Sequence, residues 1–235
     1  MPLPSFEVPT YEIELISTGQ KINIRPFLVK EEKLLLMALE TDDKKTIIDA
    51  IQQILENCIK TKNIKIKELA SFDVEYIFLK IREKSLGEVV PVRVTCPDTE
   101  KLFDVDLNLG DIIVVKDPNH KTNIEISDSF GILMKYPSFS TMQILSLEEN
   151  PVKRVFKIIS SCIKSIYDKD NTYNASEYSE KEVQDFLDNL PQSAFDKINN
   201  FYETLPKILF QTEVKSPYSQ KMVKVRLDNF MDFFG

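Results

Sequence analysis

The sequence has 235 residues, of which 43% are hydrophobic and 29% are charged, with a formal net charge of −7. A chain of this size can form one large domain or two lobes of about 100 to 130 residues. The acidic balance argues against a general nucleic-acid binder, and no apolar run approaches the roughly 18 residues of a membrane span. The first residues lack the features of a signal peptide, so we expect folding in a cytosol with reduced cysteines.

The first half of the sequence predicts an extended segment, then helices, then a hairpin. Apolar residues between positions 47 and 59 follow the spacing of one helix face, and a further helix begins at Ser71. The stretch VTCPDTEKLFDVDL, residues 94–107, alternates apolar and polar residues around a polar turn, which is typical of a β-hairpin. Its Cys96-Pro97 pair looks like half of a zinc knuckle. We place a lobe boundary within residues 114–123.

The second half predicts the same order of elements. The expected elements are a helix that begins at Asn150 and Pro151 and whose apolar face extends to Ile166, an inserted polar loop near 168–180, helices over 183–190 and 195–205, and a hairpin over 214–227. Ser179 and Glu182 form a capping box before the helix over 183–190.

Three features recur in the same order in both halves and predict an internal duplication. The two hairpins align without a gap at an offset of 120, which pairs Cys96-Pro97 with Ser216-Pro217. ILENCIK and IISSCIK each end a helical pattern, and IEL near the start weakly matches IEI in the second half. We therefore predict an α+β protein of two duplicated lobes, each with helices and antiparallel β-hairpins. The predicted lobes are residues 1–115 and 120–235.

The residue inventory favours binding over catalysis. The five glycines form no phosphate-binding motif, and His120 is the only histidine, which excludes a histidine-based triad or a metal-hydrolase helix. We expect His120 to be a solvated loop residue. We also expect no catalytic residue, no cofactor and no small-molecule ligand.

The hairpins resemble zinc knuckles without the ligands. Structural zinc takes four Cys or His ligands, commonly as two CxxC pairs. Here Thr99 follows Cys96 at the ligand spacing, and Ser216 and Ser219 stand at the matching positions of the other hairpin. One thiolate cannot hold the ion, so we expect no metal site and hairpins held by apolar packing. The candidates for this packing are Val94, Leu102, Val105 and Leu107.

The last residues of the sequence are rich in large apolar side chains, namely Phe230, Met231, Phe233 and Phe234. Something must cover them. Either they fold back against the helix of Phe201 in their own lobe, or they bind a partner protein on an aromatic and Met-rich patch. We keep partner binding by these residues as a hypothesis.

Several stretches of the chain resemble the baseplate hub subunit and hub assembly chaperone family of T4-like contractile-tailed bacteriophages. They are VPTYEIELISTGQKINIRPFLVKEEKLLLMALE near the start, CI after the next helix, CP in the first hairpin, MKYPS at 134–138 and the closing DNFMDFFG. The segment RPFLVKEEKLLLMALE, residues 25–40, is the most specific. Related tail proteins carry zinc-knuckle-like CPxCG pairs, so the resemblance implies that the first hairpin is a relic that has lost its metal.

The resemblance implies a structural component or an assembly chaperone that binds other baseplate hub proteins. Its location would be the virion tail baseplate, or the host cytoplasm during assembly. Two alternatives stay open from the residues alone. One is an infection-associated enzyme such as a cell-wall hydrolase, which would need a carboxylate pair in a cleft. The other is a non-phage cytosolic adaptor.

Overall fold

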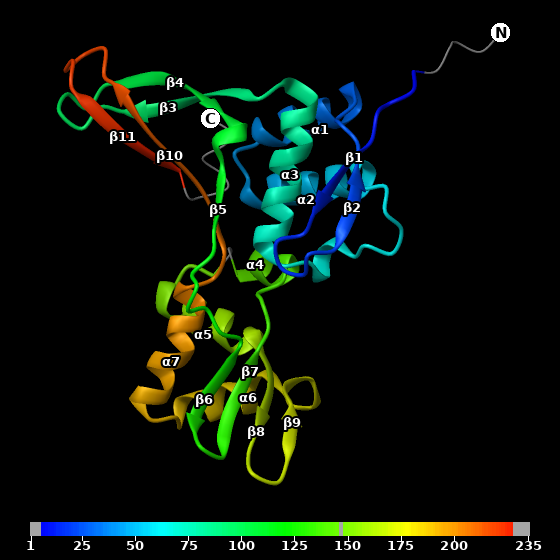
Figure 1. The fold of residues 1–235 in the computed structure, drawn as a ribbon, viewed down its shortest axis with the longest axis vertical. Coiled ribbons are helices and arrows are strands. Elements are labelled where there is room, and N and C mark those ends of the chain that lie inside the picture. Colours follow the sequence, from blue (N-terminus) through cyan, green and yellow to red (C-terminus); the bar gives the residue numbers. More distant parts are fainter. Residues whose placement is uncertain (1–5, 146–147, 228–235) are drawn as a thin grey trace. The chain divides into compact units, whose positions relative to one another are not determined.

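The computed structural model describes residues 6–145 and 148–227, and these residues form two compact units. The first unit comprises 6–66, 72–115 and 207–227, and the second comprises 67–71, 116–145 and 148–206. Apart from 67–71, the second unit is therefore inserted in the chain between two strands of the first, β5 (Ile113–Val115) and β10 (Lys207–Lys215). These strands pair antiparallel with Lys207 opposite Val115, and Figure 1 shows them side by side.

The N-terminal part of the first unit packs a short hairpin against helices. Its elements are β1 (Tyr11–Glu14), β2 (Lys21–Ile24), α1 (Val29–Leu39), α2 (Lys44–Cys58) and α3 (Ser71–Leu86). Ile22 and Ile24 alternate with exposed neighbours on β2 and are fully buried, as are Ile54 on α2 and Phe78 on α3. Burial of one face of each element supplies the main stabilising term for this part of the unit.

A buried ion pair organises the segment RPFLVKEE. Nη2 of Arg25 lies 2.9 Å from Oε1 of Glu31, and Nη1 donates to the other carboxylate oxygen and to the Pro26 carbonyl. The same carboxylate accepts the Leu28 N–H at 2.8 Å, at the start of α1. Burial acts to raise the pKa of Glu31, but its bonds to Arg25 and Leu28 outweigh this, and the pKa lies below its usual value.

Two hairpins complete the first unit and share a core with α3. One pairs β3 (Val89–Thr95) with β4 (Leu102–Asn108), and the other pairs β10 with β11 (Met222–Leu227). The second hairpin belongs to a three-stranded antiparallel sheet in the order β11-β10-β5. The core of the two hairpins consists of Leu79, Val90, Val92, Val105, Leu107, Leu109, Ile208 and Phe210.

The division of the chain differs from the lobes 1–115 and 120–235 expected from the sequence. Residues 207–227 group with the first unit, although the sequence assigned them to the second lobe. The reason is physical: β10 pairs with β5, and its apolar residues Ile208 and Phe210 are buried beside Leu79 of α3. One boundary between the two units falls after Val115.

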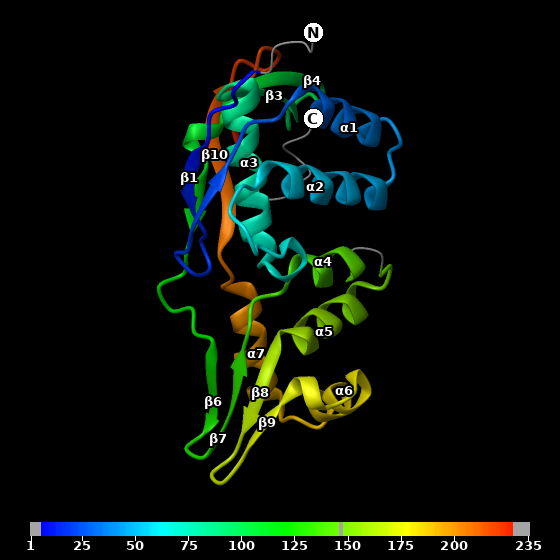
Figure 2. The same ribbon diagram turned by 90° about the vertical axis from the view of Figure 1, so that its right-hand side faces the viewer.

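The second unit is an antiparallel sheet with helices packed on it. The sheet order is β6 (Asn123–Ser127), β7 (Phe130–Met134), β8 (Ile163–Tyr167) and β9 (Thr172–Asn174). The helices are α4 (Phe139–Leu145), α5 (Pro151–Cys162), α6 (Glu180–Asp188) and α7 (Gln192–Glu203). Figure 2 shows α4, α5 and α6 on one side of this sheet. Ile132, Ile159, Leu187, Ile198 and Phe201 are among the residues of its core.

The predicted helix starts are confirmed. The side chain of Asn150 accepts the Lys153 N–H at 3.0 Å, and Pro151 is the first residue of α5. Ser179 and Glu182 form the predicted capping box of α6, with the Ser179 N–H donating to the Glu182 carboxylate at 2.8 Å. Both caps satisfy N–H groups that a helix leaves without partners in its first turn.

Two predictions for the second half are wrong. The helix does not extend to Ile166, because residues 163–167 form β8 and pair with β7. Their burial alternates at first, and their β-branched residues suit a strand. The segment 168–180 is not only a loop, since it contains β9 and a short 3₁₀ helix over 175–177. A turn built on Asp168, whose carboxylate accepts the Asn171 N–H, lets β9 pair back onto β8.

Candidate functional site: the junction of two hairpins

The turns of the two hairpins have the same backbone geometry. Cys96 N–H donates to the Lys101 carbonyl at 2.9 Å, and Ser216 N–H donates to the Lys221 carbonyl at the same distance. In each turn the residue four places after the first, Glu100 or Gln220, adopts a left-handed φ, of 57° and 59° respectively. The gapless alignment at an offset of 120 is therefore matched by equal turn structures. Duplication of whole lobes stays a prediction.

Cys96 and Ser216 bring the two turns together. The Ser216 hydroxyl donates to the Cys96 sulfur at 3.2 Å, and the Ser219 oxygen lies 3.6 Å from the same sulfur. Both Cys96 and Ser216 are fully buried. The prolines that follow them, Pro97 and Pro217, are exposed at the outer side of each turn. The four residues of the sequence motif thus lie at one junction within the first unit.

Hydrogen bonds make Cys96 an unusually acidic thiol. Hydrogen bonds with the hydroxyls of Ser216, Thr99 and Ser219 lower the pKa of Cys96 to about 6, because they stabilise the thiolate. Cys58 and Cys162 behave in the opposite way, since burial raises the pKa of these thiols to about 11 and about 12. They lie on buried helix faces and act as small apolar residues.

Two distances at the junction are close to the spacing of zinc ligands. A tetrahedral zinc site with Zn–S distances of about 2.3 Å places its ligands about 3.8 Å apart. The hydroxyl oxygens of Ser216 and Ser219 lie 3.2 and 3.6 Å from the Cys96 sulfur. One thiol and three hydroxyls do not fit structural zinc, however, and the described residues contain no cluster of His, Cys, Asp and Glu that could hold a metal ion.

Contacts outside the junction also hold the two hairpins together. The Tyr218 hydroxyl donates to the Leu102 carbonyl at 3.2 Å, and its ring meets that of Phe103 edge to face with centroids 6.4 Å apart. Lys221 forms an exposed ion pair with Asp98 at 3.2 Å. Sequence reasoning missed Tyr218 and placed Leu102 in the packing, although Leu102 is 54% exposed. Of the other predicted packing residues, Val105 and Leu107 are buried and Val94 is partly buried.

His120 is not the solvated loop residue that the sequence suggested. Its ring stacks on Tyr136 with centroids 5.6 Å apart and contacts Phe201 at 5.0 Å, and its Nδ1 lies 2.9 Å from the Thr204 hydroxyl. Its Nε2 is buried and has no hydrogen-bond partner among the described residues. Burial lowers the pKa of His120, with nearby Asp117 acting in the opposite direction. No local sequence pattern predicts this packing.

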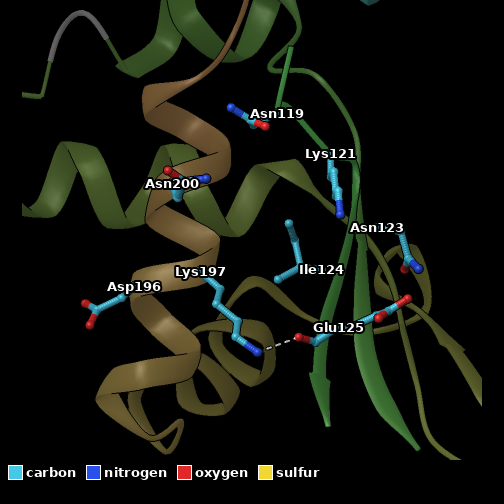
Figure 3. Close-up of a pocket in the computed structure, with 8 residues that line it drawn as sticks. All are labelled: Asn119, Lys121, Asn123, Ile124, Glu125, Asp196, Lys197 and Asn200. Atoms are coloured by element: carbon cyan, nitrogen blue, oxygen red, sulfur yellow. Dashed lines mark hydrogen bonds between the residues drawn. The ribbon is translucent and has the colours of Figure 1, made fainter. Parts of the chain in front are cut away.

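A polar hollow of about 480 Å³ lies between β6 and α7 in the second unit (Figure 3). Lys197 reaches from α7 and donates to the Glu125 carbonyl at 2.8 Å and to the Ile126 carbonyl at 3.4 Å. These carbonyls border the point where the register of β6 shifts against β7. The Lys197 ammonium therefore binds backbone carbonyls that lie at the irregular part of strand β6. The other polar side chains of the hollow, such as Asn119 and Asp196, are exposed.

The four apolar residues proposed to bind a partner, Phe230, Met231, Phe233 and Phe234, lie outside the described residues. The hypothesis about them stays a prediction. Within the described ranges 6–145 and 148–227, no helix is both long and apolar enough to cross a membrane.

The fold and the junction define an α+β protein of small antiparallel sheets and helices whose two hairpin turns are held by a thiol and hydroxyl cluster. Comparison with known protein families gives a match over most of the chain. The family described as T4 bacteriophage base plate protein matches residues 8–235, so the chain belongs to this family. The predicted place among baseplate proteins of T4-like phages is thereby confirmed. Searches of curated proteins and of solved structures gave no match.

Proposed function

We propose that the protein is a component of the baseplate hub, or a chaperone of hub assembly, and that it acts by binding other hub proteins. The observation that carries the proposal is the family match, which spans almost the whole chain and assigns the protein to the phage tail baseplate. Within this proposal the protein is not an enzyme, and its partners are proteins and not nucleic acids or small molecules.

The side-chain chemistry of the described residues supports a role in binding. The acidic thiol at the hairpin junction is enclosed, since Cys96 is fully buried, so its bonds serve to join the two hairpins. In the polar hollow, the Lys197 ammonium is held by backbone carbonyls. Exposed apolar side chains, by contrast, occur on several helices, including Leu36 and Met37 on α1 and Val152 on α5. Apolar side chains of this kind are common in the contact surfaces between proteins.

Mass spectrometry of purified virions beside infected-cell lysate separates the two forms of the proposal. A hub component is present in virions at a fixed ratio to other baseplate proteins, whereas a chaperone is present in the lysate and absent from virions. In the second case the protein should co-sediment with hub intermediates from cells infected by an assembly-blocked phage. A protein absent from virions and from all such intermediates would contradict the proposal.

A further inference from the structure

Two adjoining grooves in the second unit expose apolar side chains beside lysines. The larger groove has a volume of about 700 Å³ and lies between α5 and α6. The smaller one, of about 320 Å³, lies between α4, α5 and the segment before α6. Lys157 and Glu180 line both grooves, so the two form one surface, which we call the α5 groove. Figure 2 shows the helices concerned on the same side of the sheet.

Apolar side chains line both parts of the α5 groove. Val152, which lines the larger groove, is 64% exposed, and Ile144, which lines the smaller one together with Tyr178, is 69% exposed. Phe156 lies one turn after Val152 on α5, and its ring is fixed by stacking on Phe195 at 4.9 Å. Apolar side chains one turn apart along a helix form the kind of groove that receives the apolar face of a partner helix.

Lysines dominate the rim, in contrast to the net charge of −7 of the whole chain. Lys135, Lys153 and Lys181 form no ion pair among the described residues, and Lys157 pairs with Glu148 at 2.8 Å. Two acidic residues, Glu180 and Asp188, also line the surface. The N-termini of α5 and α6 both border the larger groove and add partial positive charge to that of the lysines. The summed field favours an acidic partner.

We propose that the α5 groove binds an amphipathic helix of another baseplate protein, with an apolar stripe flanked by acidic residues. The proposal rests on the proposed function, because it names the surface through which the protein binds its partners. A second copy of this chain is a poorer occupant of the groove. If the α5 grooves of two copies faced each other, the lysines of one would repel those of the other, and two hollow surfaces would not fill each other.

A designed pair of peptides tests this proposal. Both are stapled helices with leucines along one face; one carries glutamates beside the leucines and the other carries lysines. We expect the acidic helix to bind the full chain in fluorescence anisotropy and to lose about tenfold or more in affinity with Val152→Asp or with Lys153→Glu/Lys181→Glu. The matched control is Leu36→Asp, which changes an exposed apolar residue of α1 in the first unit and should leave the affinity unchanged. Circular dichroism checks that each variant is folded.

Three results would overturn the inference. They are equal binding of the two peptides, equal affinity of wild type and the groove variants, and a dimer in sedimentation equilibrium that Val152→Asp dissociates, which would make a second copy the occupant. The assay uses no phage protein other than this chain, so its outcome is independent of the virion experiment. Peptide binding by a protein that is absent both from virions and from hub intermediates would refute the proposed function alone. Presence in virions or in hub intermediates without peptide binding would refute the α5 groove alone.

Discussion

The sulfur of Cys96 lies 3.2 Å from the hydroxyl oxygen of Ser216, a residue 120 positions later in the chain. The two residues begin equivalent hairpin turns, and their contact lies at the position where a zinc knuckle would have its metal. Hydroxyl groups here do locally what a metal would do in a knuckle: they stabilise a thiolate and join two turns.

The first prediction is that Cys96 is a thiolate at neutral pH. The pKa of about 6 should appear as an inflection near pH 6 in the thiolate absorbance near 240 nm, taken as the difference between wild type and Cys96→Ala. Ser216→Ala should shift this inflection to higher pH. An inflection near the ordinary value of 9.0 in wild type would show that the hydroxyls do not stabilise the thiolate.

The same pKa has a consequence for stability. The folded pKa lies below the unfolded one, so the contribution of Cys96 is fully present above the unfolded pKa and is lost as pH falls toward 6. Urea unfolding between pH 6 and 9 should show a rise in the free energy of unfolding with pH that Cys96→Ala lacks. Parallel curves for the two proteins would count against the account.

The second prediction concerns the resemblance of the junction to a zinc knuckle. The triple substitution Thr99→Cys/Ser216→Cys/Ser219→Cys should create a site for one zinc ion, because the Ser216 and Ser219 oxygens lie 3.2 and 3.6 Å from the Cys96 sulfur, near the roughly 3.8 Å between ligands of a tetrahedral zinc site. Elemental analysis should find about one zinc per chain, and the metal should raise the melting temperature. The control is the same variant with Cys96→Ala, which should bind zinc more weakly. A folded triple variant without zinc would mean that the resemblance to a knuckle is only superficial.

The third prediction is that Glu31 is essential for the stability of the first unit. Glu31→Gln leaves Arg25 as a buried charge with a weakened partner and should cost about 3 to 5 kcal/mol of unfolding free energy. Glu12→Gln removes the exposed partner of Lys21 and should cost about 1 kcal/mol or less. Urea denaturation measures both values, and similar costs for the two substitutions would contradict the structural role of the buried pair.

The fourth prediction concerns His120 and acid. Because burial lowers the pKa of His120, this histidine binds a proton more readily in the unfolded chain than in the folded one as the pH falls. Stability is therefore lost as pH falls below the ordinary value of 6.5. His120→Phe keeps the ring against Tyr136 and Phe201 without a titrating group, so its melting temperature should fall less between pH 7 and pH 5 than that of wild type. An equal fall in both proteins would show that His120 does not contribute to acid sensitivity.

Local patterns allowed α2, α3, α6, α7, the start of α5 and the two hairpins that contain Cys96 and Ser216 to be predicted from the sequence, whereas α1 and α4 were not predicted. Asn150 and the pair Ser179 and Glu182 start helices as expected, since capping depends on residues within one turn. The end of α5 could not be predicted in this way, because Ile163 fits both a helix stripe and a buried strand, and only pairing with β7 decides between them.

The arrangement of segments that lie far apart in the chain could not be predicted from the sequence. Alignment of the two hairpins showed that Cys96 and Ser216 are equivalent, but it did not show that they touch. That contact depends on β10 returning to pair with β5 after the whole second unit, which no local pattern encodes. The environment of His120 has the same origin, since its ring partners come from residues 136 and 201.

The central claim is that the protein is needed to build the tail baseplate, and loss of the protein tests it most directly. A phage with a stop codon early in this gene should, in a non-suppressing host, fail to form complete baseplates, and electron microscopy of the lysate should show no contractile tails with baseplates attached. A plasmid copy of the gene should restore them. Normal tailed particles at normal yield without the protein would contradict the account.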